Sequence, residues 1–196
     1  MNRKGSTRNE AEEHDAAWAA FQQDRLDEAA RLYRSLADRG SASAQDFLGW
    51  MYLEGKGVSS DPEMARTLFI RAAESSYPWA KYHLGYLALR EEDYGTARRW
   101  LEAAASGDVL PAIFRLGVLH QLGLGVPVSE ELACRYYERA GERGHILARR
   151  NIAGIMLKRE RRPWERLKWR WRLFKNGLQG GRLMARNRYD ARLGMQ

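Results

Sequence analysis

One pattern of apolar positions recurs along the chain. Apolar residues at i, i+3, i+4 and i+7 occur in four places, and this spacing puts all four side chains on one stripe of a helix. The copies are Ala29, Leu32, Tyr33 and Leu36; Ala65, Leu68, Phe69 and Ala72; Ala97, Trp100, Leu101 and Ala104; and Ala133, Tyr136, Tyr137 and Ala140. Recurrence at a regular interval predicts an internal repeat built from amphipathic helices.

A second helical segment precedes three of these copies. Leucine–glycine pairs at Leu48-Gly49, Leu84-Gly85 and Leu116-Gly117 lie 16, 12 and 16 residues before the corresponding alanine. The four-residue difference belongs to the turn between the two helices, since a surface turn can lose residues without moving core side chains. The long turns contain Gly-x-Gly, which ends the first helix, and then Asp61 or Ser129, which caps the next. The pattern predicts helix–turn–helix units.

The best copy carries a recognisable motif. It runs Leu48-Gly49-x-x-Tyr52-x-x-Gly55-x-Gly57-Val58-x-x-Asp61 and resembles the Sel-one-like repeat, a subclass of the tetratricopeptide-type α-solenoids. The copy from Leu116 matches well, the copy from Leu84 lacks the Gly-x-Gly turn, and the first copy is degenerate. Over residues 11–157 the resemblance implies an all-α, right-handed α-solenoid of about four repeats. It also implies a non-catalytic scaffold or adaptor that binds another protein.

In tetratricopeptide-like folds the first helix of each pair lines a concave face. Carrying that register over implies a partner-binding groove formed by Trp18, Trp50, Tyr86, His14, Asp46, Tyr82 and Phe114. The competing interpretation is that these side chains fill space between adjacent repeats. Large aromatic side chains beyond those needed for the core favour a groove, because aromatics are common anchors of interfaces.

Charge is distributed unevenly along the chain of 196 residues. Hydrophobic residues make up 44%, enough for a folded core, and the formal net charge is +8. Thirteen basic residues against three acidic ones fall within residues 158–196, so the rest of the chain is slightly acidic. We expect a disordered N-terminus over residues 1–10 and a basic, tryptophan-rich tail over 158–196 with a function of its own.

The tail contains one predicted amphipathic helix. Trp164, Leu167, Trp171 and Phe174 form one stripe, and glycines from Gly177 onward are expected to end the helix. The predicted tail surface comprises Arg166, Lys168, Arg170, Arg172, Lys175, Trp164 and Trp171. Three interpretations stay open: the stripe caps the end of the solenoid, the tail binds an anionic membrane surface, or it binds nucleic acid, which has the weakest support.

Catalytic chemistry has little support in the sequence. The four histidines are scattered without the spacing of a metal site, Cys134 is alone, and the Gly-x-Gly turns follow no strand. We expect no catalytic residues, no metal and no cofactor. A single cysteine and the lack of a signal-peptide hydrophobic core predict a cytoplasmic protein, with peripheral membrane attachment as the alternative.

Overall fold

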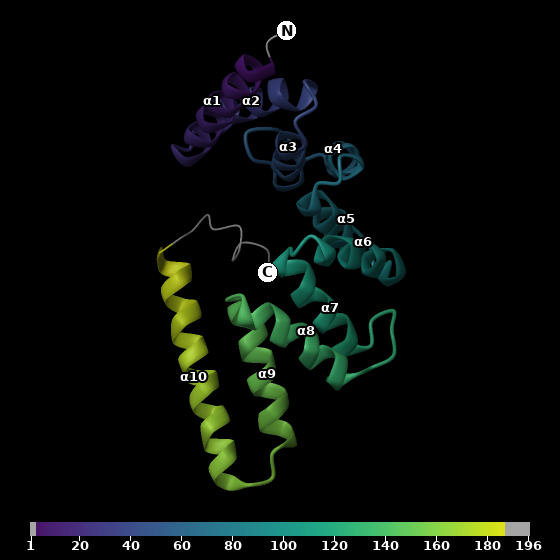
Figure 1. The fold of residues 1–196 in the computed structure, drawn as a ribbon, viewed down its shortest axis with the longest axis vertical. Coiled ribbons are helices and arrows are strands. Elements are labelled where there is room, and N and C mark those ends of the chain that lie inside the picture. The colour runs from purple at the N-terminus through teal and green to yellow at the C-terminus, as the bar shows by residue number, and fades with distance from the viewer. Residues whose placement is uncertain (1–2, 187–196) are drawn as a thin grey trace. The chain divides into compact units, whose positions relative to one another are not determined.

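The computed structural model describes the backbone of residues 3–186 and the side chains of residues 10–178. Across this range the chain forms helices and no strands, which confirms the all-α prediction. The helices are α1 (Arg3–Gln22), α2 (Leu26–Asp38), α3 (Ala42–Glu54), α4 (Pro62–Glu74), α5 (Pro78–Arg90), α6 (Tyr94–Ser106), α7 (Leu110–Leu122), α8 (Glu130–Glu142), α9 (Ile146–Arg159) and α10 (Pro163–Arg186) (Figure 1).

Helices pack mainly against their neighbours in sequence. The chain divides into two compact units, residues 1–87 and 88–196. In the first, α1 packs on α2, α2 on α3 and α3 on α4; in the second, contacts run from α6 through α10 in the same order. Packing between sequential elements is the defining property of a helical-repeat protein, in which each repeat covers the apolar face of the next.

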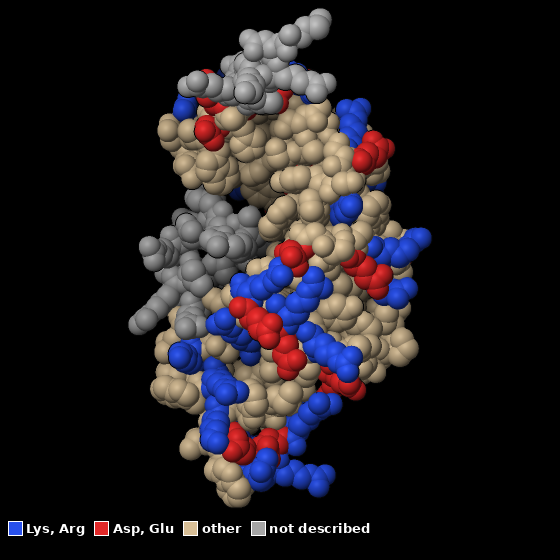
Figure 2. Space-filling model, in the orientation of Figure 1, with Lys and Arg blue, Asp and Glu red and all other residues tan. Residues whose placement is uncertain are grey.

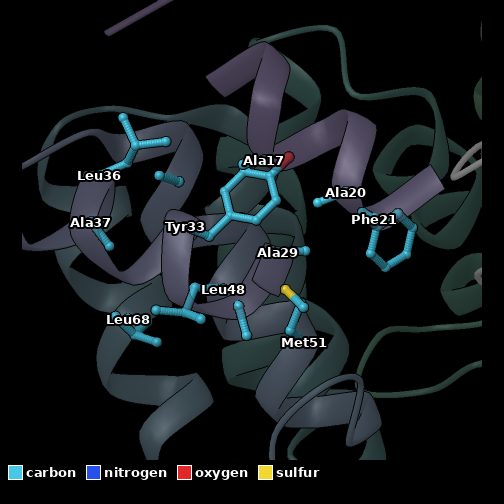
Figure 3. Packing of buried hydrophobic residues seen from close by; sticks show 12 residues of the cluster. Ala17, Ala20, Phe21, Ala29, Tyr33, Leu36, Ala37, Leu48, Met51 and Leu68 are labelled. Carbon is cyan, nitrogen blue, oxygen red and sulfur yellow. The ribbon is translucent and has the colours of Figure 1, made fainter. Parts of the chain in front are cut away.

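The core of the first unit is built from the predicted stripes. Tyr33 is fully buried at its centre, with Ala17, Leu36 and Met51 around it (Figure 3). Alanines at the points of closest approach allow the helices to come together, and larger side chains fill the space between these points. The periodic apolar positions of the sequence are therefore mostly core positions, and Leu32, Trp100 and Tyr136 are the half-buried exceptions.

The glycines of two Leu-Gly pairs, Gly49 and Gly117, are required by close packing within a repeat. A Cβ atom at Gly49 would lie 2.7 Å from the ring of Phe69 on α4. At Gly117 it would lie 2.6 Å from the ring of Tyr137 on α8. The first helix of the pair thus accommodates an aromatic ring of the second helix against its backbone.

The long turns also follow the sequence prediction. Gly55 and Gly123 end α3 and α7 in the left-handed conformation, with φ of 63° and 72°. The Asp61 carboxylate caps α4 by accepting hydrogen bonds from the amides of Glu63 and Met64, at 3.1 and 2.9 Å. The turn geometry fixes where the second helix of the repeat begins.

Both ends of the helical region differ from the prediction. The first helix begins at Arg3, so the expected disorder of residues 1–10 is wrong for residues 3–10, where only Gly5 interrupts a helix-compatible run. At the other end α10 continues past Gly177 to Arg186. A glycine inside a helix costs only about 1 kcal/mol relative to alanine, which a helix packed on a neighbour tolerates.

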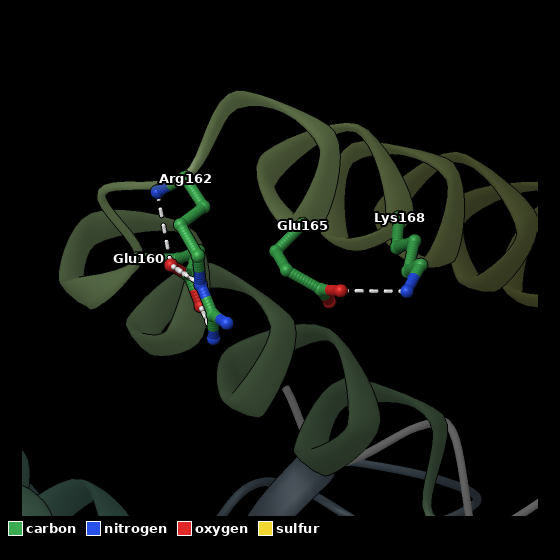
Figure 4. Close-up of polar contacts among 4 residues, drawn as sticks. All are labelled: Glu160, Arg162, Glu165 and Lys168. Atoms are coloured by element: carbon green, nitrogen blue, oxygen red, sulfur yellow. Dashed lines mark hydrogen bonds and ion pairs between the residues drawn. The ribbon is translucent and has the colours of Figure 1, made fainter.

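A short polar turn joins α9 to α10. Glu160 accepts hydrogen bonds from the amide and Nε of Arg162, at 2.9 and 3.1 Å, and this ion pair lowers the pKa of the Glu160 carboxyl (Figure 4). Just inside α10, Lys168 pairs with Glu165 at 2.6 Å. The turn brings α10 back along α9, and the two helices pack together. α9 therefore has a partner that its sequence does not reveal.

Candidate binding surfaces

Four aromatic rings form a cluster on the first helices of the first two repeats, which we call the aromatic patch: Trp18 and Phe21 on α1, and Phe47 and Trp50 on α3. The ring of Phe21 lies 5.6 Å from Trp18 and 5.7 Å from Trp50. Phe47 lies 5.7 and 5.4 Å from the same two indoles. The two tryptophans thus share a floor of two phenylalanine rings, 5.1 Å apart.

The patch is exposed at one edge and anchored at the other. Trp18 is 37% exposed and Trp50 is half-buried, whereas Phe21 is buried at 6%. Underneath, Phe47 contacts the buried ring of Tyr33 at 4.5 Å. A rigid aromatic surface held from below presents apolar area without requiring the side chains to become ordered on binding.

Two predicted groove residues are buried, which corrects their assignment. Tyr82 is fully buried, and Asp46 is 6% exposed with Oδ1 2.7 Å from Nδ1 of His83. His83 in turn stacks on Phe69 at 4.7 Å. The register predicted that Asp46 faces a groove. Instead, its carboxylate points into the interior of the first unit, where it pairs with His83 of α5.

The remaining predicted groove residues are half-buried. His14 packs edge-on against Tyr33 at 5.5 Å, and Tyr86 lies on α5. Phe114 belongs to the second unit, where it contacts Tyr137 at 5.5 Å and stacks on His145 at 4.5 Å. Trp18 and Trp50 are therefore the predicted pair that the structure brings together, and Phe21 and Phe47 complete their site.

A second apolar surface lies on α10, which we call the α10 stripe. Its side chains are 51–66% exposed and comprise Trp164, Leu167, Trp171, Phe174 and Leu178. The half-buried residues Glu165, Trp169, Leu173 and Asn176 occupy the opposite face. Because α9 is the helix packed on α10, that opposite face is the one that contacts α9. Capping of the solenoid by the stripe was one of three interpretations left open by the sequence; here the narrower apolar face covers α9, and the stripe faces outward.

Basic side chains flank the α10 stripe on both sides. Helical geometry places Lys168 and Lys175 along one side of the stripe and Arg170 along the other. Arg166 and Arg172 lie farther round, toward the face that packs on α9, and the Arg172 guanidinium lies 4.4 Å from the centre of the Trp169 ring. All five are exposed. Figure 2 shows blue side chains next to tan ones over α10. The combination is an apolar ridge between two positive borders.

The described residues contain no cluster of three or more potential metal-ligating side chains. The histidines instead have structural roles, as His145 illustrates. Its Nδ1 accepts the amide of Ala148 at 3.3 Å at the start of α9, and burial together with Arg115 lowers its pKa to about 4. No helix within the described part of the chain is long and apolar enough to cross a membrane.

Sequence comparison decides the family. The family model of the Sel1 repeat matches residues 42–77, 80–109 and 110–145, more than half of the chain. The chain belongs to the Sel1 repeat family. The three matches correspond to α3/α4, α5/α6 and α7/α8, so the helix pair that carries Trp18 and the pair that contains α10 lie outside them.

The chain is also similar to solved structures and to a curated protein. A Sel1 repeat protein from Oxalobacter formigenes has a TM-score of 0.77 at 25% identity, over 99% of this chain and 84% of that one. A protective antigen of uropathogenic Escherichia coli has a TM-score of 0.66 at 24% identity, over 79% of this chain and 34% of that one. Chitin synthase regulatory factor 3 of Schizosaccharomyces pombe is 28% identical over 128 residues, 62% of this chain. This chain spans 14% of that curated relative.

Sel1 repeat proteins generally act as protein-interaction scaffolds. Sequence analysis missed two members of the surfaces that could serve this purpose. Phe47 precedes Leu48 of the Leu-Gly pair, and its place in the patch follows from its ring contacts with Phe21 and Trp50. Leu178 continues the 3–4 spacing of the α10 stripe one step beyond Phe174, and that spacing was the signal that could have identified it.

Proposed function

We propose that this Sel1 repeat protein is a non-catalytic adaptor that binds an apolar segment of another protein on the aromatic patch. The observation that carries the proposal is that exposed Trp18 and half-buried Trp50 lie on a shared floor of Phe21 and Phe47. Tryptophans in such settings dominate the binding energy of protein interfaces. The patch lies on first helices, the helices that line the binding face in tetratricopeptide-like folds.

A second candidate function is favoured by the outward-facing α10 stripe. An exposed ridge of five large apolar residues with basic borders is an attachment surface distinct from the patch. Under this alternative, α10 attaches the scaffold to an anionic surface while the repeats hold a protein. The two functions are compatible because the two surfaces share no residue.

The experiment compares two matched double variants as bait in native lysate. Trp18→Ala/Trp50→Ala removes the two indoles of the patch, and Trp164→Ala/Trp171→Ala removes two indoles from α10. We expect a partner retained by wild type and by the α10 variant but reduced at least ~10-fold with the patch variant, since loss of a hot-spot aromatic costs about 2 kcal/mol or more. Circular dichroism and thermal melting establish that both variants are folded.

Equal recovery of every captured protein by wild type and by a folded patch variant would overturn the patch proposal. Loss with the α10 variant alone would transfer the protein-binding role to α10. Purified partner and isothermal titration then give the affinity difference directly.

A further inference from the structure

We propose that α10 binds the surface of an anionic lipid membrane, lying in the membrane plane with the α10 stripe among the headgroups and upper acyl chains. The inference goes beyond the aromatic patch and assigns the occupant of the α10 surface. It rests on three observations: where the apolar side chains point, which charges border them, and which face of the helix is already occupied.

The orientation of the helix suits an interfacial position. One face, with Trp169 and Leu173, packs on α9, and the α10 stripe lies on the opposite face. Insertion therefore requires no separation of α10 from the fold. Two indoles, one phenyl ring and two leucines form the exposed ridge, and tryptophan rings are favoured at the level of the headgroups.

The charge distribution selects an anionic occupant. Three exposed basic residues, Lys168, Arg170 and Lys175, border the α10 stripe, and two more, Arg166 and Arg172, lie farther round the helix. Glu165, the acidic residue within the described part of α10, is paired with Lys168. Basic side chains on both borders reach the headgroup phosphates when the ridge is inserted. Each such residue adds to attraction by anionic lipid.

A second copy of the chain fits this surface poorly. The spacing of the α10 stripe equals that of a coiled-coil seam, with Trp164, Trp171 and Leu178 at one position and Leu167 and Phe174 at the other. The flanking positions are then Lys168, Arg170, Lys175 and Gly177. In parallel or antiparallel pairing these positions set positive charge against positive charge. Charge repulsion therefore disfavours a self-paired helix.

An acidic helix of a partner protein is also less suitable than a lipid surface. The stripe is two heptads long, shorter than the three to four heptads over which coiled-coil patterns are normally sustained. Two of its three residues at the first seam position are tryptophans, which are larger than the aliphatic residues favoured there. A fluid lipid surface accommodates large rings without requiring a complementary hole.

The test uses the full chain and vesicles of phosphatidylcholine with or without phosphatidylglycerol, separated by sedimentation. The apolar variant is Trp171→Ser/Phe174→Ser, and its control is Leu122→Ser/Val128→Ser, which removes two equally exposed apolar side chains outside α10. The charge variant is Arg166→Gln/Arg170→Gln/Lys175→Gln. Its control is Arg31→Gln/Arg71→Gln/Arg90→Gln, which makes the same change in net charge at exposed positions elsewhere.

We expect wild type and both controls to partition at least ~10-fold more strongly into the anionic vesicles than into the neutral ones. The apolar variant should lose roughly 100-fold of this partitioning, and the charge variant a comparable factor that shrinks as salt is raised. Quenching of indole fluorescence by brominated lipid should fall in the apolar variant, which reports insertion rather than simple adhesion.

Three outcomes would overturn the proposal. One is failure of wild type to prefer anionic vesicles. Another is sensitivity to the charge variant with no effect of the apolar variant, which indicates a polyanion site such as one for nucleic acid. The third is a wild-type dimer, seen by analytical ultracentrifugation, that the apolar variant dissociates. Partner capture by the aromatic patch is measured separately, so failure of one proposal leaves the other intact.

Discussion

At the residue scale, two helix glycines of the second unit offer a direct measure of packing. Gly117 and Gly154 both lie in helices of the second unit, but an added Cβ meets Tyr137 at 2.6 Å in the first case and nothing within 4 Å in the second. Gly117→Ala should lower the free energy of unfolding by about 1–3 kcal/mol through overpacking. Gly154→Ala should be neutral or stabilise by up to about 1 kcal/mol, because alanine is the better helix former. Urea denaturation of both variants gives the two values.

The Gly154 variant also separates helix propensity from packing. Equal effects of the two substitutions would contradict the tight contact between α7 and the Tyr137 ring. A larger loss at Gly117 assigns the difference to that contact, since both substitutions add the same methyl group to a helix interior.

The depressed pKa of His145 gives a second prediction at the residue scale. Burial and Arg115 lower the pKa of this imidazole from 6.5 to about 4. Between these values the unfolded chain binds a proton that the folded chain excludes, so stability should fall as pH falls from about 6.5 to about 4. The total loss should be about 1–3 kcal/mol, most of it in the second unit.

His145→Asn removes the titrating group and keeps a side chain that can cap α9. Its unfolding free energy, measured by urea denaturation across the same pH range, should vary less than that of wild type. An unchanged slope would assign the pH dependence to another group. The carboxyls of Asp93 and Asp108 have lowered pKa values, so their contribution is lost below about pH 4, at the acid end of this range.

Two residues mark the limit of sequence-based assignment at this scale. Asp46 and Tyr82 occupy helix positions that generally face the groove, yet both are buried. The partner of Asp46 is His83, which lies 37 residues away in the chain and has no spacing that links it to Asp46 in advance. Trp18 and Trp50 were predictable because each directly follows a small residue, Ala17 or Gly49, at the same register of its helix. Their contact through Phe21 and Phe47 depends on helix packing.

At the scale of elements, each Gly-x-Gly turn ends a helix and also contacts the preceding repeat. The first glycine adopts the left-handed conformation expected from the sequence. The second glycine packs against the preceding repeat: a Cβ at Gly125 would lie 2.6 Å from Cβ of Tyr94, and one at Gly57 would overlap the carbonyl of Leu26. The motif thus positions one repeat on the next. Local sequence predicts the turn, but only the packed structure identifies the contact that requires the second glycine.

α10 also shows that sequence does not predict which surfaces of a helix pack together. Its sequence contains two apolar stripes, and hydrophobic periodicity identifies both. The wider stripe was the natural candidate for packing, yet the narrower one contacts α9. The choice depends on the direction in which the Glu160–Arg162 turn returns the chain, and periodicity contains no information on that direction.

At the scale of the whole molecule, α10 has two roles on opposite faces, and they need different experiments. Removing residues 160–196 takes away both the cover of α9 and the α10 stripe, so a loss of localisation after truncation would not distinguish them. Point variants on each face do. Trp169→Ala/Leu173→Ala weakens the contact with α9, whereas Trp171→Ser/Phe174→Ser alters side chains that are already exposed.

We expect truncation after Arg159 to lower the melting temperature of the second unit by about 5–15 °C, which corresponds to the loss of about 2–4 kcal/mol of packing. Trp169→Ala/Leu173→Ala should reproduce most of this loss, and the truncated protein should bind a hydrophobic dye through the uncovered face of α9. Trp171→Ser/Phe174→Ser should change stability by no more than about 0.5 kcal/mol, since surface substitutions away from packed contacts rarely do more. Calorimetry of all three proteins provides the comparison. If the stripe variant melted as low as the truncated chain, the stripe would be structural, and α10 would be a terminal cap without a free binding face.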